Sequence, residues 1–258
     1  MFIFRHGETT YSQGKVTIAE AHDLTPQGID TTLTSAESLY QLLEESFPVT
    51  AWSSPYGRAL HTALLCMDLV IGDFQTTVGE DAESSITICD SLEEVLQFNY
   101  QLFVCLVNGG TFQGYTFNPC ETNPDRISVE SYFLTDRASQ IPELVKSSWP
   151  VEIRTAVEAM ESCEHATCRM HRFLRGLMQT SEQTQHILFT HDGLLTLMVA
   201  EATDWKYLTL ERGKFVRLSW MDDDLAVSYI EGRTIANHHR PIFATARDRY
   251  GADYLERT

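Results

Sequence analysis

The chain has 258 residues, 43% of them hydrophobic and 21% charged, a composition typical of a soluble globular protein with a full core. Its 36 acidic and 19 basic residues give a formal net charge of −17 at pH 7. This charge argues against binding to nucleic acid or to anionic membranes, because both need a basic surface. We attribute the acidity to solubility. An anionic small substrate would have to be held by a local cluster of Arg and His.

The cysteines and the start of the chain bear on the cellular compartment. The apolar start is interrupted by Arg5 and His6 after four residues, which is too early for a signal peptide. No apolar run approaches the ~18 residues needed to span a bilayer. We therefore expect a cytoplasmic protein with reduced thiols. Its six cysteines have no paired spacing: Cys66, Cys89, Cys105, Cys120, Cys163 and Cys168.

The first predicted element is a short buried strand over residues 1–4, which ends at Arg5, His6 and Gly7. An imidazole beside a guanidinium is suited to attack an electrophile that carries negative charge, such as the phosphorus of a phosphate monoester. A neutral imidazole avoids the repulsion that a carboxylate or thiolate would meet, and an arginine binds the anionic oxygens in a fork. Taken alone, the motif is explained equally well by an arginine and a histidine that merely end a strand.

Two helices are predicted next, each with a proline at its start. Thr25 and Pro26 are typical of an N-cap and of the first helical residue. A second strand over 49–52 leads into Ser-Ser-Pro at 53–55, which predicts a second helix opened in the same way. Arg58 falls in its first turn. That position places Arg58 at the carboxyl end of a strand, beside N–H groups that favour an anion.

A third strand is predicted over residues 85–89, and Glu94 follows it. From there the pattern changes to aromatic residues and turn formers over 97–150. We interpret this segment as an insertion packed over the domain, because its aromatic side chains would be poorly soluble if exposed. It is either a lid that selects the substrate or additional core, and its nearness to Glu94 favours the lid.

The remaining elements continue the alternation of helix and strand. A long helix is predicted over about 150–179, a strand over 186–190 and a helix over 193–202. Two further strands, 215–220 and 225–230, indicate a hairpin. Such alternation predicts a three-layer αβα fold, with a mainly parallel sheet and helices on both faces.

Ionisable residues follow the predicted strands at four places. His6, Arg58, Glu94 and His191 each come shortly after a strand. Ligands bind outside the carboxyl ends of parallel strands, so these four side chains should converge on one edge of the sheet. This predicted convergence is the strongest argument for an active site.

At this point the sequence resembles the histidine phosphatase superfamily, the phosphoglycerate mutase-like proteins. The resemblance covers about residues 1–96 and 158–230 in the family's order, so that as a set its motifs are highly specific. The matching segments are Arg5-His6-Gly7-Glu8-Thr9, Asp23-Leu24-Thr25-Pro26-Gln27-Gly28, Ser53-Ser54-Pro55-Tyr56-Gly57-Arg58-Ala59, Met160-Glu161-Ser162 with Arg169 and Phe173 behind it, and Thr190-His191-Asp192-Gly193.

The resemblance implies a role for each of five residues. His6 would take the phosphoryl group on its ring nitrogen, while Arg5, Arg58 and His191 surround the phosphate and stabilise the transition state. The family's leucine-x-glutamate motif would place the proton donor at Glu94, which later activates water. We expect Glu94 to be partly shielded, so that some of it stays protonated near neutrality.

The sequence departs from the family at several positions. Ser12 stands where an asparagine often touches the phosphate, and a hydroxyl can still donate one hydrogen bond. Thr17 lies where mutases often place a threonine that contacts the substrate. The glycine-rich continuation after Glu94 is missing, as are the additional basic residues with which a mutase holds a bisphosphate. Their absence favours hydrolysis.

No metal site or cofactor is predicted. The four candidate zinc ligands Cys163, His165, Cys168 and His171 would spread around a continuous helix, so a structural site is improbable. Asp192 could touch the substrate, but capping of the following helix is the favoured interpretation.

We therefore predict a single domain over residues 1–258 with a cap-like insertion over 97–150. Its predicted activity is that of a histidine acid phosphatase-type phosphomonoesterase, which needs no cofactor and acts on a small phosphorylated metabolite. Two alternatives stay open: a mutase or phosphotransferase with the same intermediate, and a non-catalytic module that binds phosphorylated ligands. Neither nucleic acid nor a membrane is an expected partner, and a homo-oligomer is compatible with the sequence.

Overall fold

The computed structural model describes residues 1–10, 23–71, 85–94, 102, 105–106, 109–118, 148–158, 161, 163–180, 183–202, 210–232 and 240–256. The chain divides into two compact units. The main unit comprises Met1–Glu94 and Cys168–Arg257, and the second unit comprises Val95–Thr167 with Thr258. The insertion predicted over 97–150 falls within the second unit. Its action as a cap stays a prediction.

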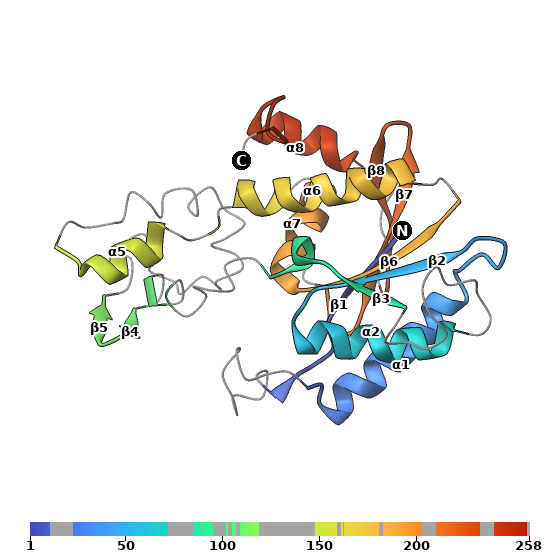
Figure 1. Ribbon diagram of the computed structural model, residues 1–258, viewed down its shortest axis with the longest axis horizontal. Helices are drawn as coiled ribbons and strands as arrows, with labels where there is room; N and C mark the ends of the chain where they lie inside the picture. The colour runs from blue at the N-terminus through green and yellow to red at the C-terminus, as the bar shows by residue number, and fades with distance from the viewer. Residues whose placement is uncertain are drawn as a thin grey trace. The chain divides into compact units, whose positions relative to one another are not determined.

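The main unit is built on a six-stranded sheet with the strand order β3-β2-β6-β1-β7-β8 (Figure 1). Its strands are β1 (Phe2–Arg5), β2 (Val49–Ser53), β3 (Ile86–Ile88), β6 (Gln185–Thr190), β7 (Phe215–Met221) and β8 (Asp224–Ile230). The pairs β2–β3, β2–β6 and β1–β6 are parallel, whereas β7 is antiparallel to both β1 and β8. The sheet is thus mainly parallel, as the sequence predicts.

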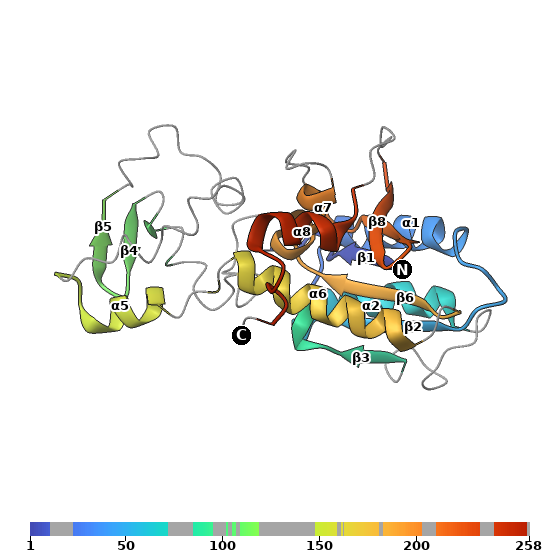
Figure 2. The same ribbon diagram turned by 90° about the horizontal axis from the view of Figure 1, so that it is seen from above.

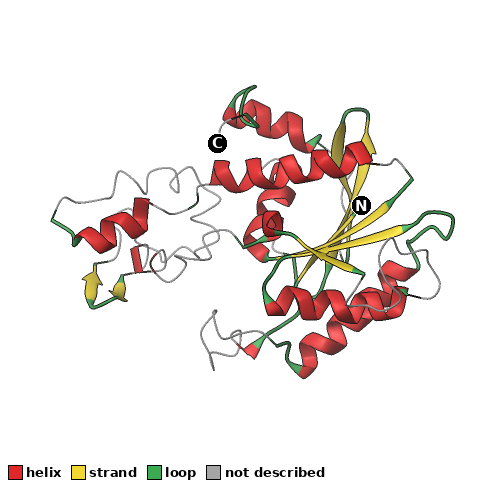
Figure 3. Ribbon diagram, in the orientation of Figure 1, coloured by secondary structure: helices red, strands yellow, loops and turns green. Residues whose placement is uncertain are grey.

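Helices cover both faces of this sheet (Figures 1 and 3). They are α1 (Pro26–Tyr40) and α2 (Gly57–Val70) on one face, and α6 (Cys163–Thr180), α7 (Asp192–Ala202) and α8 (Ile242–Tyr250) on the other. The side chains of β2 contact the two helix layers in alternation, because successive side chains of a strand point to opposite faces of the sheet. Val49 and Ala51 join the core beneath α2, whereas Trp52 contacts Phe173 of α6, with ring centroids 5.4 Å apart. The three-layer prediction is confirmed.

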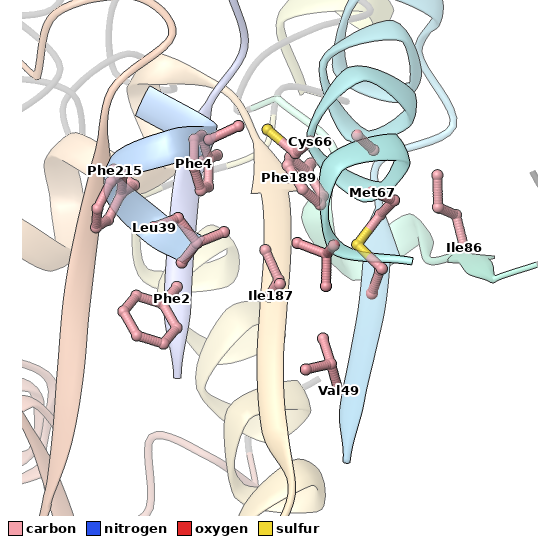
Figure 4. Packing of buried hydrophobic residues seen from close by; sticks show 14 of the residues in the cluster. Phe2, Phe4, Leu39, Val49, Cys66, Met67, Ile86, Ile187, Phe189 and Phe215 are labelled. Carbon is pink, nitrogen blue, oxygen red and sulfur yellow. The ribbon is translucent and has the colours of Figure 1, made fainter. Parts of the chain in front are cut away.

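The core between the sheet and α1 and α2 fixes the first strand (Figure 4). Phe2 and Phe4 are both buried in it, and the Phe4 ring lies 5.3 Å from Phe189 and 4.9 Å from Phe215. Ile3, which points to the other face, is also fully buried. A strand buried on both faces has little freedom to move. The residue that follows it, His6, is therefore held at a defined place.

Helix starts show where local signals succeed and where they fail. The hydroxyl of Thr25 accepts the N–H of Gly28 at 3.0 Å, which confirms the predicted N-cap of α1. The predicted start of the second helix at residues 53–55 is wrong. The helix α2 begins at Gly57, and Tyr56 is its N-cap without a side-chain capping bond. The hydroxyl of Ser54 accepts the N–H of Tyr56 at 3.5 Å and forms a shorter hydrogen bond with His191 at 2.8 Å.

The long helix predicted over 150–179 is also wrong, because the chain forms two helices. These are α5 (Val151–Glu158) in the second unit and α6, and Glu161 between them is not helical. The sequence Ser162-Cys163-Glu164 is itself typical of a helix start, with an acidic residue in the first turn of α6. Apolar periodicity alone cannot show such a break.

In the main unit the last helix packs beside α6. Figures 1 and 2 show α6 and α8 side by side, and the rings of His171 and Phe243 lie 5.0 Å apart. The predicted hairpin of β7 and β8 is confirmed: Met221 pairs with Asp224, and Asp222 takes the positive φ of 55° that such tight turns require.

The second unit contains a smaller hairpin, formed by β4 (Gly110–Phe112) and β5 (Tyr115–Phe117). Phe117 packs edge-on against Trp149, with ring centroids 5.3 Å apart. The sequence-based interpretation expects the aromatic side chains of residues 97–150 to be packed, and Phe117 is packed in this way. Across the described residues of both units, the helices are too short or too polar to cross a membrane.

Candidate active site

The carboxyl ends of the parallel strands meet at one edge of the sheet, and the predicted site residues lie there. Arg5 ends β1 and His6 follows it, while His191 follows β6. Arg58 lies in the first turn of α2, after β2. Glu94 comes after β3 and the short 3₁₀ helix η3 (Asp90–Leu92). The contacts below show that the five side chains lie within one constellation.

His6 has one ring nitrogen tied to the backbone and the other turned towards a cation. Its Nδ1 lies 2.8 Å from the carbonyl oxygen of Gly7. A carbonyl can only accept, so Nδ1 carries the proton and Nε2 keeps its lone pair. Arg58 donates its Nε–H to this Nε2 at 3.3 Å. The side chain thus presents the nitrogen that a nucleophilic histidine needs.

The surroundings of His6 keep its imidazole neutral. Burial lowers the pKa of His6 well below its ordinary value, and the guanidiniums of Arg58, Arg5 and Arg212 act in the same direction. His6 is only 9% exposed. A neutral ring between cations can approach a phosphate dianion without repulsion while the cations attract it.

The two arginines are held differently. Arg58 is 6% exposed, and its guanidinium lies 5.3 Å above the ring of Tyr56. Arg5 forms an ion pair through Nη1 with Asp192 Oδ1 at 3.0 Å and donates to the carbonyl of Leu210. Arginines fixed in this way offer preorganised donors for phosphate oxygens.

His191 completes the group around His6. The ring centroids of the two histidines are 5.2 Å apart. The Nε2 of His191 forms a hydrogen bond with the hydroxyl of Ser54 at 2.8 Å, while its buried Nδ1 has no hydrogen-bond partner among the described residues. Burial, then Arg58 and His6, lower the pKa of His191 well below its ordinary value.

The turn after His6 is packed too tightly for a side chain. The N–H of Gly7 donates to Thr62 Oγ1 at 3.0 Å, and a Cβ on Gly7 would lie 2.7 Å from Thr32 Oγ1. A Cβ on Gly28 would lie 2.3 Å from the carbonyl oxygen of Glu8. Only glycine permits this approach of the turn to α1. This close packing fixes the backbone of the turn that follows His6.

Glu94 lies beside the second histidine. Its Oε1 accepts the N–H of Gly193 at 3.1 Å, in the first turn of α7. The side chain is half-buried, which fits the expected partial shielding. Its role as proton donor stays a prediction.

Asp192 is the first residue of α7, where its carboxylate is favoured by the helix dipole. It accepts the hydroxyl of Thr196 at 3.1 Å and forms the ion pair with Arg5. The sequence offered capping or substrate contact for Asp192, and the structure adds an ion pair that orients Arg5. The other predicted substrate contacts, Ser12 and Thr17, lie outside the described residues.

Three further residues at the site were not predicted to contribute. Ser54 binds His191, Tyr56 lies under Arg58, and Arg212 precedes β7 beside Gly213. The N–H of Gly213 reaches the carbonyl oxygens of Arg5 and His6 at 3.2 and 3.1 Å. An Arg-Gly pair at the start of a strand is a weak sequence signal. The hydrogen bonds of Gly213 to Arg5 and His6 join distant segments of the chain, which a local pattern does not reveal.

Two of the four residues considered as zinc ligands, Cys168 and His171, form contacts with Tyr254. Cys168 donates to the carbonyl of Tyr254 at 2.7 Å, and His171 Nδ1 lies 2.8 Å from the Tyr254 hydroxyl. Among the side chains that the structure describes, no group of three or more His, Cys, Asp or Glu could hold a metal ion.

Comparison with known proteins supplies a family and a fold. The family model for the histidine phosphatase superfamily (branch 1) matches residues 1–74 and 129–228. A search of curated proteins found no significant match.

Solved structures of similar fold span nearly the whole chain. YhfR of Bacillus stearothermophilus is 16% identical, with a TM-score of 0.54 over 91% of this chain and 96% of its own. A mutant phosphoserine phosphatase of Entamoeba histolytica, in complex with phosphoserine, is 14% identical, with a TM-score of 0.51 over 90% and 95%. The α-ribazole phosphatase of Shigella flexneri is 16% identical, with a TM-score of 0.51 over 91% and 97%. At these identities the shared feature is the fold.

Proposed function

Because the chain belongs to the histidine phosphatase superfamily, we propose that it hydrolyses the phosphate monoester of a small metabolite through a phosphohistidine formed on His6. The observation that carries this proposal is the state of His6. Its Nδ1 proton is held by the Gly7 carbonyl, its Nε2 is directed at Arg58, and burial keeps the ring neutral.

The first step transfers the phosphoryl group to the protein. The lone pair of His6 Nε2 forms a bond to phosphorus while the bond from phosphorus to the ester oxygen breaks. Phosphate oxygens take the Arg58 N–H that otherwise points to Nε2, and Arg5 and His191 stabilise the remaining charge. This geometry supplies hydrogen-bond donors around the transferring group.

The leaving oxygen needs a proton, because an alkoxide is a poor leaving group. Glu94 donates this proton, a contribution of ~10²- to 10⁴-fold for general acid catalysis. The resulting carboxylate then takes a proton from water, whose oxygen attacks phosphorus. The bond between phosphorus and Nε2 breaks, and inorganic phosphate and a neutral His6 are regenerated.

Release of nitrophenol from p-nitrophenyl phosphate tests the proposal. We expect activity in the wild-type protein and none in His6→Ala. The control is His165→Ala, which removes an exposed histidine of α6. Brief incubation with labelled substrate should also leave acid-labile phosphate on the wild-type protein and on His165→Ala, but not on His6→Ala.

The alternatives give different results in this assay. A mutase or phosphotransferase would move phosphate between positions and release little of it. Absent release would favour a non-catalytic module. Equal release in wild-type and His6→Ala would contradict the phosphohistidine on His6.

A further inference from the structure

Arg169 in α6 contacts the segment that leads to Glu94, more than seventy residues earlier in the chain. Its Nη1 donates to the carbonyl oxygens of Asp90, Ser91 and Glu93 at 3.2, 2.8 and 3.2 Å, and its Nη2 to that of Glu93 at 3.3 Å. The Asp90 carbonyl also accepts the N–H of Glu93 at 3.1 Å, within the turn. Arg169 thus adds a side-chain donor to three carbonyls of the segment from η3 to Glu93.

The backbone ladder alone fixes this segment poorly. β3 is an edge strand of three residues, two of them exposed. The first segment of the main unit ends shortly after it, at Glu94. Besides Arg169, Thr190 Oγ1 donates to the carbonyl of Leu92 at 2.7 Å, and Gly193 N–H donates to Glu94 itself. A planar guanidinium suits the task, because its donors are rigidly spaced and can serve several acceptors at once.

We propose that Arg169 is a positioning residue of the reaction, which holds the backbone before Glu94 so that the carboxyl group meets the leaving oxygen. This inference rests on the acid role proposed for Glu94. The four hydrogen bonds described above go to backbone carbonyls of the segment before Glu94. Loss of these hydrogen bonds should leave phosphoryl transfer from aryl phosphates nearly intact and slow the transfer from alkyl phosphates, whose leaving oxygen needs the proton.

Two phosphate monoesters separate these effects. β-Glycerol phosphate has an alkoxide leaving group that needs a proton, whereas p-nitrophenolate leaves readily without one. For Arg169→Gln we expect kcat/KM on β-glycerol phosphate to fall at least about tenfold more than on p-nitrophenyl phosphate. In a Glu94→Gln background the same substitution should add little to that difference.

Arg172→Gln is the matched control, because Arg172 lies on the same helix and donates its Nε–H to a backbone carbonyl, that of Leu255, at 2.6 Å. It should change both substrates equally. Tm measured for each variant shows how much folding is lost. Arg169→Lys keeps the positive charge near His191 but not the fork, so we expect it to behave like Arg169→Gln.

Three results would overturn the proposal. The first is an equal loss on both substrates in Arg169→Gln, and the second is full activity of Arg169→Lys on β-glycerol phosphate. In either case a selective defect in Glu94→Gln would leave the acid role of Glu94 standing. The third is an unselective Glu94→Gln variant, which would refute the acid role and this inference with it.

Discussion

The two halves of the candidate site are built on different parts of the sheet. The histidines and arginines follow β1, β2 and β6, strands that have neighbours on both sides and are buried between helix layers. Glu94 follows β3, a short edge strand, and side chains from other elements hold the segment before it. The central half of the site, Arg5, His6, Arg58 and His191, binds the phosphate of any monoester and is thus fixed by the central strands. The edge half, Glu94, serves the leaving alcohol and depends on a few side-chain hydrogen bonds.

Replacing Arg58 by Ala should produce the largest effect, because it removes a charged donor from the central half. We expect kcat/KM to fall on the order of 10³-fold, equally for alkyl and aryl phosphates. Arg175→Ala is the control, since its guanidinium also lies over a ring, 5.2 Å from that of Phe243. A defect confined to alkyl phosphates would contradict the division into halves.

Glu94→Gln should affect the edge half alone. We expect a loss of ~10²-fold on alkyl phosphates and a much smaller loss on aryl phosphates, whose leaving groups need less protonation. Rates of both substrate classes, measured with the same preparation, test this. If both fall together, Glu94 is not the acid.

Gly7→Ala tests the rigidity of the central half. The new methyl group would meet Thr32 Oγ1 at 2.7 Å and the backbone oxygen of Gly28 at 3.0 Å, so the turn beside His6 must shift. We expect a loss of about tenfold or more on both substrate classes. Gly176→Ala is the control, because a Cβ there meets nothing within 4 Å. Unchanged activity of Gly7→Ala would show that the turn adapts.

Arg212→Gln should give the smallest effect, a shift of the pH profile. His6 attacks only when neutral, so kcat/KM falls as pH drops through its pKa in the free protein. Arg212 is one of the cations that lower this pKa, and its removal should raise it. The acidic limb should therefore move to higher pH. A shift to lower pH would contradict the inference that the charge of Arg212 lowers the pKa of His6.

Local signals account for what the sequence predicted well. Three predicted elements depend on residues close together in the chain, and the structure contains all of them. They are the apolar strand before His6, the N-cap at Thr25 and the hairpin turn at Asp222. The positions of Arg58 and Glu94 after predicted strands pointed to these two residues, and in the structure Arg58 donates to His6 while Glu94 accepts the N–H of Gly193, two residues after His191.

Contacts between distant segments account for what the sequence could not show. Ser54 has the residue type of a helix cap, but it binds His191, 137 positions away. The four bonds of Arg169 span 76 to 79 positions. No spacing rule within one helix or strand reveals such pairs. The fold must bring the segments together first.

The hydrogen bond between His6 Nδ1 and the Gly7 carbonyl also decides the regiochemistry of the proposed intermediate. Two phosphohistidine isomers exist, and they differ in chemical stability and in recognition by isomer-specific antibodies. With the nitrogen nearer the main chain occupied by the carbonyl of the next residue, Gly7, only the tele isomer can form. Its detection on the trapped protein would link a single backbone oxygen to the chemical identity of the adduct.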